Sequence, residues 1–228
     1  MIAVAFALPA ESSDFVKLLN DRRNTARGLA GELHGHQIQV LHTGVGAAEA
    51  HQQLGFFFAE PPLPQLMISA GFAGALNDEL DVGDLLLGEN YSDPLPAAAV
   101  TSAVIHRGQL ATADVMLDST ADRRRLAEST GAIAVDMETQ FVHASCRLLG
   151  VPMLSLRAIT DTPQRPFPAP PSVLFDVERQ KTNIPRLVGY LITHPLAIPR
   201  LIAFSKRVAL ARRSLTNALD QLLRAPLV

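Results

Sequence analysis

The chain has 228 residues, of which 48% are hydrophobic and 18% are charged, and its formal net charge is −2. A chain of this length and apolar content buries a sizeable core, so extensive disorder is excluded. Its one cysteine excludes an intrachain disulfide, and no apolar run reaches the roughly 18 residues of a membrane-spanning helix. The N-terminus enters a strand-like run without a basic segment, so we expect a cytoplasmic rather than a secreted protein.

Apolar runs typical of strands alternate with helical patterns along the first two thirds of the chain. The strand-like runs lie at 1–8, 37–43, 65–70, 82–87, 132–135 and 151–159, and the helical patterns at 10–19, 47–59, 119–130 and 138–149. Such alternation is typical of parallel strands joined by helices. The sequence therefore predicts an α/β fold with a mixed, mostly parallel central sheet flanked by helices, in a single domain over residues 1–228.

Two glycine-containing segments follow predicted strands. Thr43-Gly44-Val45-Gly46 opens the helix predicted at 47–59, so its amides can approach an anion or a sugar, although its spacing is not a dinucleotide fingerprint. Ser69 to Gly74 is interpreted as a second strand-to-turn unit, in which glycine serves a tight bend. His34-Gly35-His36 lies in a predicted hairpin turn without partners at metal-ligand spacing, so no metal site is expected.

A pair of carboxylates at the ends of two strands gives the strongest indication of chemistry. Val135-Asp136-Met137-Glu138 brings Glu138 to the start of a helix, and Arg157-Ala158-Ile159-Thr160-Asp161 brings Asp161 to the end of a buried strand. Open α/β sheets bind ligands at the carboxyl ends of their strands, so both acids are expected in one pocket. The alternative is a helix cap or a solvated turn, and it is stronger for Asp161, because Asp-Thr-Pro is an ordinary strand exit.

The C-terminal region differs in composition from the rest. Five prolines between Thr162 and Pro171 predict a stiff irregular loop or lid, 162–171, beside Asp161. Residues 199–224 carry six basic side chains and one acid, a charge of +5, and an apolar stripe of helical spacing runs through Leu201, Phe204, Val208, Ala211, Leu215, Ala218 and Leu222.

The segment 199–224 is predicted to form a basic amphipathic helix. Such a helix packs on its own domain in most proteins and lies on a membrane in a minority, and both interpretations remain open. Anionic lipid attracts basic residues, so a helix that lies on a membrane is expected to bind it reversibly, as a peripheral contact. Nucleic-acid binding is not expected, because aromatic residues are only 5% of the chain and none lies between Lys206 and Arg213.

In their order along the chain, these segments resemble the purine nucleoside phosphorylase and nucleosidase superfamily. The resemblance covers about residues 1–162 and adds Leu8-Pro9-Ala10-Glu11 and Val82-Gly83-Asp84 to the segments above. It is closest to the methylthioadenosine/S-adenosylhomocysteine nucleosidases. It implies a three-layer fold around a mixed sheet, a cleft that breaks the N-glycosidic bond of a purine nucleoside, no cofactor, and a homodimer.

The resemblance also implies a role for each matching residue. Asp161 protonates purine N7, Glu11 activates water as a general base, and Arg157 orients that water. Glu138 accepts hydrogen bonds from the ribose hydroxyls, and Met137 packs on the sugar. The matching segments add further substrate contacts, namely Leu8, Gly44, Gly71, Phe72, Val115, Met116, Leu117, Asp136 and Thr160. Phe72 departs from the pattern, because the nucleosidases commonly carry a water-holding serine there.

Other functions remain open beside hydrolysis. Phosphate-using relatives carry glycine and arginine where this chain has Glu11, and an acid there repels phosphate, so the phosphorylase alternative is less favoured. A non-catalytic, membrane-associated nucleoside-binding protein is disfavoured because all three expected acids are present. The loop 162–171 and the helix beyond it resemble the hopanoid-associated nucleosidases, which release adenine from an adenosyl-linked triterpenoid. This implies a lipid-linked purine nucleoside as substrate, in hopanoid biosynthesis.

Overall fold

The computed structural model describes residues 1–94, 105–176, 180, 184–225 and 227. Within these residues ten strands form one sheet, in which eight follow the order β2-β3-β4-β1-β5-β10-β6-β7, and β9 joins β5 to β8. The strands are β1 Ile2–Phe6, β2 Asn20–Thr25, β3 Gly28–Leu33, β4 His36–His42, β5 Leu66–Ala75, β6 Leu85–Gly88, β7 Ile105–Gly108, β8 Leu110–Thr112, β9 Ala134–Asp136 and β10 Met153–Asp161.

The centre of the sheet is parallel, and its margins are mixed. Strand β1 pairs in parallel with β4 and β5, and β10 pairs in parallel with β5. Antiparallel pairs join β2 to β3, β3 to β4, β6 to β10 and β9 to β5. The predicted mixed α/β sheet is confirmed.

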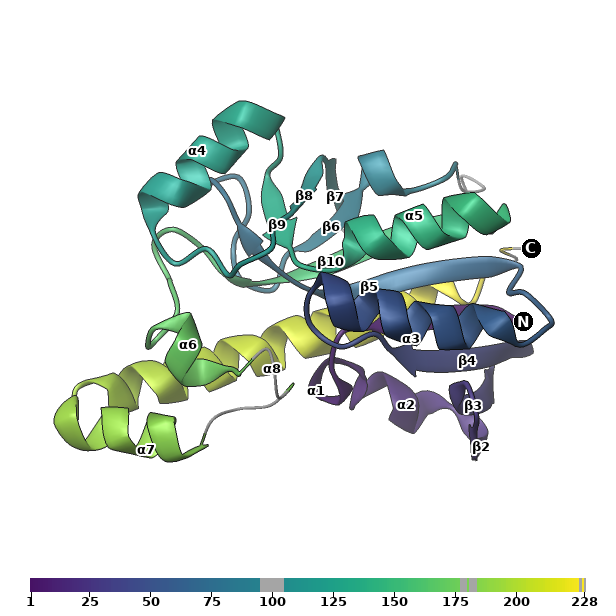
Figure 1. The fold of residues 1–228 in the computed structure, drawn as a ribbon, viewed down its shortest axis with the longest axis horizontal. Coiled ribbons are helices and arrows are strands. Elements are labelled where there is room, and N and C mark those ends of the chain that lie inside the picture. The colour runs from purple at the N-terminus through teal and green to yellow at the C-terminus, as the bar shows by residue number, and fades with distance from the viewer. Residues whose placement is uncertain (95–104, 177–179, 181–183, 226, 228) are drawn as a thin grey trace.

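Helices cover both faces of the sheet (Figure 1). They are α1 Pro9–Ser12, α2 Phe15–Leu18, α3 Ala47–Ala59, α4 Thr120–Thr130, α5 Thr139–Leu149, α6 Pro171–Leu174, α7 Ile184–Thr193 and α8 Ala197–Leu222, with a short 3₁₀ helix at Glu89–Tyr91. Helices α3 and α5 lie on one face, and α8 crosses the other (Figure 1). The result is a three-layer arrangement.

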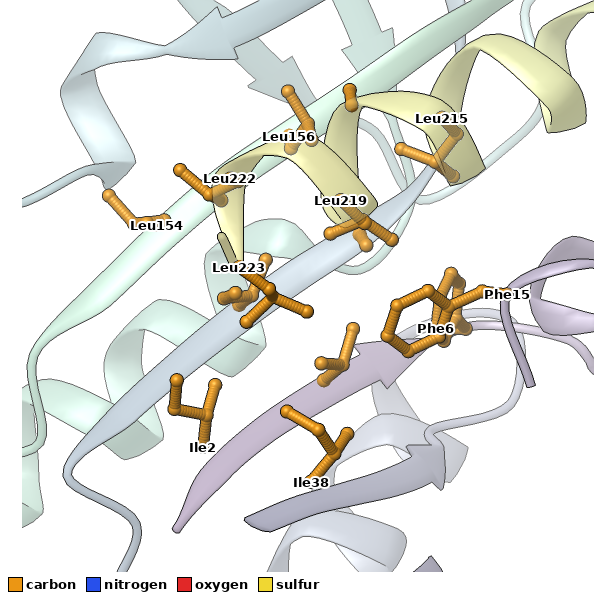
Figure 2. Close-up of a cluster of buried hydrophobic side chains, with 14 of the residues drawn as sticks. Ile2, Phe6, Phe15, Ile38, Leu154, Leu156, Leu215, Leu219, Leu222 and Leu223 are labelled. Carbon is orange, nitrogen blue, oxygen red and sulfur yellow. The ribbon is translucent and has the colours of Figure 1, made fainter. Parts of the chain in front are cut away.

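Alternating residues of β1 enter the two cores that separate these layers. Ile2 and Phe6 face the layer of α8, where they share a hydrophobic cluster with Leu219 (Figure 2). Ala3 and Ala5 point to the other face and pack in the cluster formed with α3 and α5. Side chains of a strand alternate between the faces of a sheet, so an uninterrupted apolar run is what a strand buried on both faces requires.

The C-terminal half of α8 packs on the sheet. Ala211, Leu215, Ala218, Leu219 and Leu222 are buried there. For this part of the predicted apolar stripe, the alternative of packing on the protein itself is therefore confirmed. The helix spans 197–222, close to the predicted 199–224.

Several local predictions differ from the structure. The helix predicted at 10–19 is broken into α1 and α2, which both have four residues. Strands β2 and β3 were not predicted. All six residues of β2 are exposed and show no apolar alternation, and β3 has two glycines and a glutamate among its six residues. The hairpin turn at His34 and Gly35 is confirmed, with positive φ angles of 50° and 81°.

The segment from Ser69 to Gly74 is not a turn, which corrects the prediction. Strand β5 continues without interruption to Ala75 and pairs with β10 along this stretch. Gly71 and Gly74 therefore do not form a bend; they leave space for neighbouring side chains. Among the described residues, no helix is long and apolar enough to cross a membrane.

Candidate active site

A cavity of about 310 Å³ opens beyond the ends of β1, β9 and β10. It brings together segments that are far apart in the sequence, including all three acids to which the resemblance assigns chemical work. Eleven of the fourteen predicted site residues line it, namely Leu8, Glu11, Phe72, Val115, Met116, Leu117, Asp136, Met137, Glu138, Thr160 and Asp161. Of the other three, Gly71 and Arg157 line a smaller space beside it, and Gly44 lines neither.

Glu11 is held by backbone amides at the start of α1. The amides of Ala7 and Leu8 donate to its Oε2 at 2.8 and 3.0 Å, and the amide of Phe72 donates to its Oε1 at 3.0 Å. Burial raises the pKa of Glu11, and these three hydrogen bonds oppose the rise. A Cβ on Gly71 would lie 3.2 Å from Oε1, so glycine leaves room for the carboxylate.

Glu138 immediately precedes α5 in the chain, and its carboxyl group lies at the N-terminus of α3. Its Oε1 accepts a hydrogen bond of 3.0 Å from the amide of Gly46. The glycine turn predicted to receive an anion thus receives a carboxylate of the protein itself. Gly44 contacts the backbone instead, donating to the carbonyl of Ala7 at 3.0 Å. Burial, assisted by the neighbouring carboxylates, raises the pKa of Glu138 to about 8.

Asp161 is buried at the end of β10 between two donors. The hydroxyl of Thr160 donates to its Oδ1 at 2.8 Å, and the guanidinium of Arg123 forms an ion pair with its Oδ2. Burial raises the pKa of Asp161, and Arg123 opposes this rise. A Cβ on Gly74 would lie 2.8 Å from Oδ2, so a larger residue there would displace the carboxylate. The second glycine of β5 therefore makes room for Asp161.

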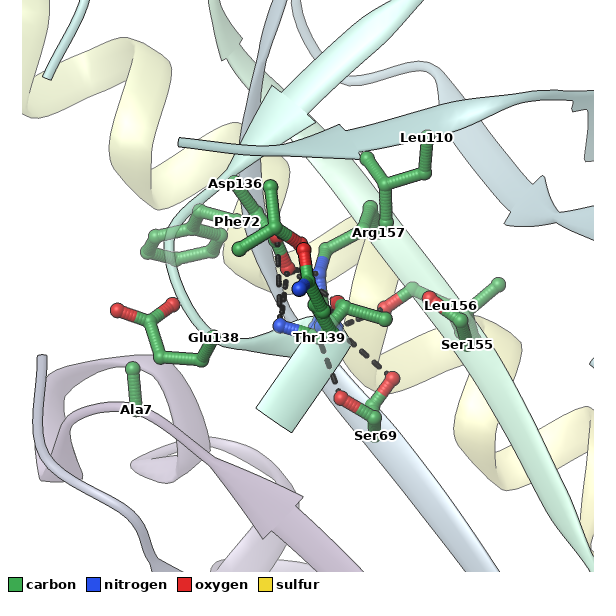
Figure 3. Close-up of polar contacts among 12 residues, drawn as sticks. Ala7, Ser69, Phe72, Leu110, Asp136, Glu138, Thr139, Ser155, Leu156 and Arg157 are labelled. Carbon is green, nitrogen blue, oxygen red and sulfur yellow. Dashed lines mark hydrogen bonds and ion pairs between the residues drawn. The ribbon is translucent and has the colours of Figure 1, made fainter. Parts of the chain in front are cut away.

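Arg157 is 3% exposed and lies at the centre of a group of polar contacts (Figure 3). Its Nε donates to Asp136 at 2.8 Å, and its Nη1 donates to the carbonyls of Ser69 and Leu156 at 2.8 and 3.0 Å. Its Nη2 donates to the hydroxyls of Ser69, at 2.8 Å, and Thr139. A guanidinium has five N–H donors, and these five contacts use all of them.

The arrangement around Arg157 therefore does not support its predicted role of orienting water, since no donor is left for that contact. Asp136 likewise points away from a substrate role, because its carboxylate is taken up by Arg157 and by Thr112 and Thr139. Both residues fix the first turn of α5, and Glu138 immediately precedes this helix. They hold Thr139, the residue after Glu138, and the roles predicted for Arg157 and Asp136 toward water and substrate stay predictions.

A second, much smaller space of about 10 Å³ adjoins Glu11 and Glu138. Thr43, Ser69 and Arg157 also line it. A polar space of roughly 10–15 Å³ accommodates one water molecule. Among the described residues, no group of three histidine, cysteine or acidic side chains is arranged to hold a metal ion.

Comparison with known proteins places this site in a family. Residues 2–102 and 89–193 match the family model described as the Phosphorylase superfamily. The chain belongs to the phosphorylase superfamily. This confirms the predicted superfamily.

Similar proteins include two 5′-methylthioadenosine/S-adenosylhomocysteine nucleosidases. The protein of Chromohalobacter salexigens is 26% identical over 168 residues, which are 58% of this chain and 70% of the relative. That of Staphylococcus epidermidis is 22% identical over 197 residues, which are 71% of this chain and 86% of the relative.

Solved structures share the fold of this chain. The 5′-methylthioadenosine/S-adenosylhomocysteine nucleosidase of S. pneumoniae, with a transition-state inhibitor, has a TM-score of 0.70 at 17% identity over 98% of both chains. A futalosine hydrolase mutant of Helicobacter pylori has a TM-score of 0.59 at 22% identity, covering 70% of this chain and 87% of that one. These likenesses confirm the fold.

Two features of the cavity in this phosphorylase superfamily member were not predicted. The first is Arg123, which stands in a run of three arginines that is typical of a solvated helix face. The second is an apolar wall formed by the loop 162–171, α6 and α8, with side chains of Phe167, Leu174, Phe175, Phe204 and Val208. The rings of Phe167 and Phe204 pack at 5.7 Å, so the loop is attached to α8. The sequence places the loop beside Asp161 and Phe204 and Val208 on an apolar stripe, but it does not show that these side chains form one wall with Leu174 and Phe175.

Proposed function

We propose that this protein hydrolyses the N-glycosidic bond of a 5′-substituted adenosine and releases adenine. The observation that carries the proposal is the convergence of Glu11, Glu138 and Asp161 on one cavity, with a space for one water beside Glu11. The similarity to proteins named as nucleosidases supports the same reaction class. The homodimer, the cytoplasmic location and the single domain stay predictions.

The three acids meet the needs of this reaction. Cleavage passes through a ribosyl cation, so the departing purine must be neutralised and the cation must be captured. Asp161 gives a proton to N7 as the bond between C1′ and N9 breaks and its electrons move onto the purine. Glu11 takes a proton from the water whose oxygen bonds to C1′. Above its raised pKa, Glu138 is a carboxylate that accepts hydrogen bonds from the two ribose hydroxyls.

Water is favoured over phosphate as the nucleophile. The space beside Glu11 is about 10 Å³, which is too small for a phosphate ion. The arginines that line the two spaces, Arg123 and Arg157, are each ion-paired with a carboxylate, which leaves their charge compensated. The phosphorylase alternative is therefore the less favoured one.

The apolar wall supports a large apolar group on ribose C5′. Five apolar side chains from the loop 162–171, α6, α8 and the residue after α6 extend the cavity beyond the acids. An extended apolar surface of this kind suits a hydrocarbon substituent, because burial of apolar area drives its binding. We therefore propose a lipid-linked adenosine, such as the adenosyl-linked triterpenoid that the resemblance implies.

Chromatography of the products from three nucleosides tests these proposals. Adenosine, methylthioadenosine and an adenosine with a long alkyl group on C5′ are incubated with the protein, with and without phosphate. Adenine release without phosphate, most efficient for the alkyl compound, is the expected result. Release that requires phosphate would establish the phosphorylase alternative, and release from adenosine alone would overturn the apolar C5′ group.

We also propose peripheral contact with an anionic membrane, through a surface that differs from the predicted stripe. Helix α7 and the first half of α8 extend beyond the sheet (Figure 1). Ile192 is 76% exposed and Leu196 is 81% exposed. Between Ile184 and Leu210 the chain has four basic residues, Arg186, Arg200, Lys206 and Arg207, and no acidic one. Each basic residue near an anionic surface contributes about 1 kcal/mol, which supports reversible binding.

Co-sedimentation with vesicles tests the membrane contact. Truncation is unsuitable, because α8 supplies core residues such as Leu215 and Leu219. The double variant Ile192→Ser with Leu196→Ser is therefore compared with Leu148→Ser, which changes an 85% exposed leucine on α5. Binding to anionic but not neutral vesicles, lost in the double variant and kept in the control, is expected. Equal sedimentation of all three proteins would contradict the proposal.

A further inference from the structure

Arg123 is the one inward-facing member of three consecutive arginines in α4. Its neighbours Arg124 and Arg125 have side chains that are 79% and 76% exposed, and they pair with acids on the same helix. Arg123 is 1% exposed. Burying a guanidinium costs several kcal/mol unless charge and hydrogen bonds compensate it. Its partners should therefore explain why the chain keeps it there.

The partners of Arg123 all lie around the purine end of the cavity. Its Nη2 pairs with Asp161 and donates to the carbonyl of Leu117 at 2.8 Å, and its Nε donates to the same carbonyl at 3.1 Å. Its Nη1 donates to the carbonyl of Ala75, the last residue of β5, at 2.8 Å. One guanidinium thus ties together β10, β5 and the segment 115–117. These three pieces form the wall that contacts the base in the proposed reaction.

Strand β5 also leaves room for this ion pair. A Cβ on Gly74 would lie 2.8 Å from Oδ2 of Asp161 and 3.1 Å from Nη1 of Arg123. Arg123 pairs with Oδ2 of Asp161, and the Thr160 hydroxyl donates to Oδ1, so both oxygens of the carboxylate are held by hydrogen bonds. Its orientation is therefore fixed before a substrate arrives.

We propose that Arg123 is a positioning residue that orients Asp161 and weakens its hold on the proton that passes to the purine. The inference rests on the proposed function. A buried carboxyl beside a cation gives up its proton more readily than one without it. Arg207, on α8, acts on Asp161 in the same direction, while Glu11 and Glu138 face it from across the cavity. Arg123 is the cation in direct contact.

Kinetics as a function of pH test the role of Arg123. Arg123→Met removes the charge. Arg123→Lys keeps the charge but lacks the planar set of N–H donors of a guanidinium, and Arg124→Met is the matched control. We expect Arg123→Met to lose about 10- to 100-fold in kcat, part of the 10²–10⁴-fold contribution of general acid catalysis. The alkaline limb of kcat/KM should move to higher pH in Arg123→Met, because the pKa of Asp161 rises without the cation. Arg123→Lys should bring the limb back toward wild type, and the control should change neither quantity.

A loss of kcat with an unmoved alkaline limb would overturn the proposal and leave only a structural role. A measurement that needs no turnover tests the role of Arg123 independently of the proposed function. The Asp161 carboxyl is titrated by ¹³C NMR, with Asp161→Asn to assign the signal. A higher midpoint in Arg123→Met than in wild type is expected even where no nucleoside is cleaved, and an equal midpoint would overturn the inference. Should Arg123→Met fail to fold, Arg123→Gln, which also removes the charge, should show the same higher midpoint.

Discussion

Replacing Glu138 by glutamine is expected to stabilise the protein at alkaline pH while weakening nucleoside binding. In the folded protein, burial and the nearby carboxylates of Asp136 and Glu11 raise the pKa of Glu138 from 4.5 to about 8. The folded state then binds this proton more tightly than the unfolded chain does. Stability is therefore fully present below pH 4.5 and is lost as pH rises to about 8. Glutamine keeps an oxygen for the Gly46 amide and never ionises.

The magnitude follows from the interval between the two pKa values. The rise in the pKa of Glu138 from 4.5 to about 8 corresponds to a free energy of roughly 5 kcal/mol, because one pKa unit is worth about 1.4 kcal/mol. Glu138 is partly exposed, and solvent screening reduces the value. We expect Glu138→Gln to gain about 2 kcal/mol over wild type above pH 8, and almost nothing near pH 5.

Urea unfolding at about pH 5 and about pH 9 measures this difference. Glu128→Gln, on the exposed surface of α4, is the matched control and should show no gain that grows with pH. Titration calorimetry with methylthioadenosine checks that Glu138→Gln, unlike the control, binds more weakly. A stability difference that is the same at both pH values would refute the reasoning, because it would mean that Glu138 does not carry a buried charge.

Three further substitutions test the site. Asp161→Asn should lose about 10²–10⁴-fold in kcat while nucleoside affinity stays nearly unchanged, as steady-state kinetics and calorimetry would show; near-normal turnover would remove Asp161 from the chemistry. Glu11→Gln should stop adenine release, and added phosphate should not restore it. Arg157→Met should destabilise the protein by about 3–5 kcal/mol in urea unfolding, because it leaves the Asp136 carboxylate buried without its partner; an unchanged midpoint would contradict this.

The positions of two of the three acids, Asp161 and Glu138, were predictable because each depends on a local pattern. Asp161 ends an apolar strand, and Glu138 directly follows one, so their meeting at one edge of the sheet follows from the strand order of α/β folds. Glu11 came from the resemblance alone. Nothing in its local sequence indicates that a backbone amide of a distant strand, at Phe72, would hold its carboxylate.

The features that sequence could not supply depend on contacts between distant segments. Arg123 looks like its exposed neighbours, and only the position of β10 shows why it turns inward. Gly71 and Gly74 were interpreted as a bend because the carboxylates that need their space come from α1 and β10. Arg157 matched a water-orienting arginine in the resemblance, but its donors are satisfied by side chains and carbonyls from other elements.

The chemical form of the released sugar tests the central claim most directly. The protein is incubated with a 5′-substituted adenosine in phosphate buffer, and the sugar product is identified by mass spectrometry. Hydrolysis with water activated at Glu11 predicts the free sugar with a hydroxyl on C1′, even when phosphate is in excess. A sugar 1-phosphate as the product would contradict the account.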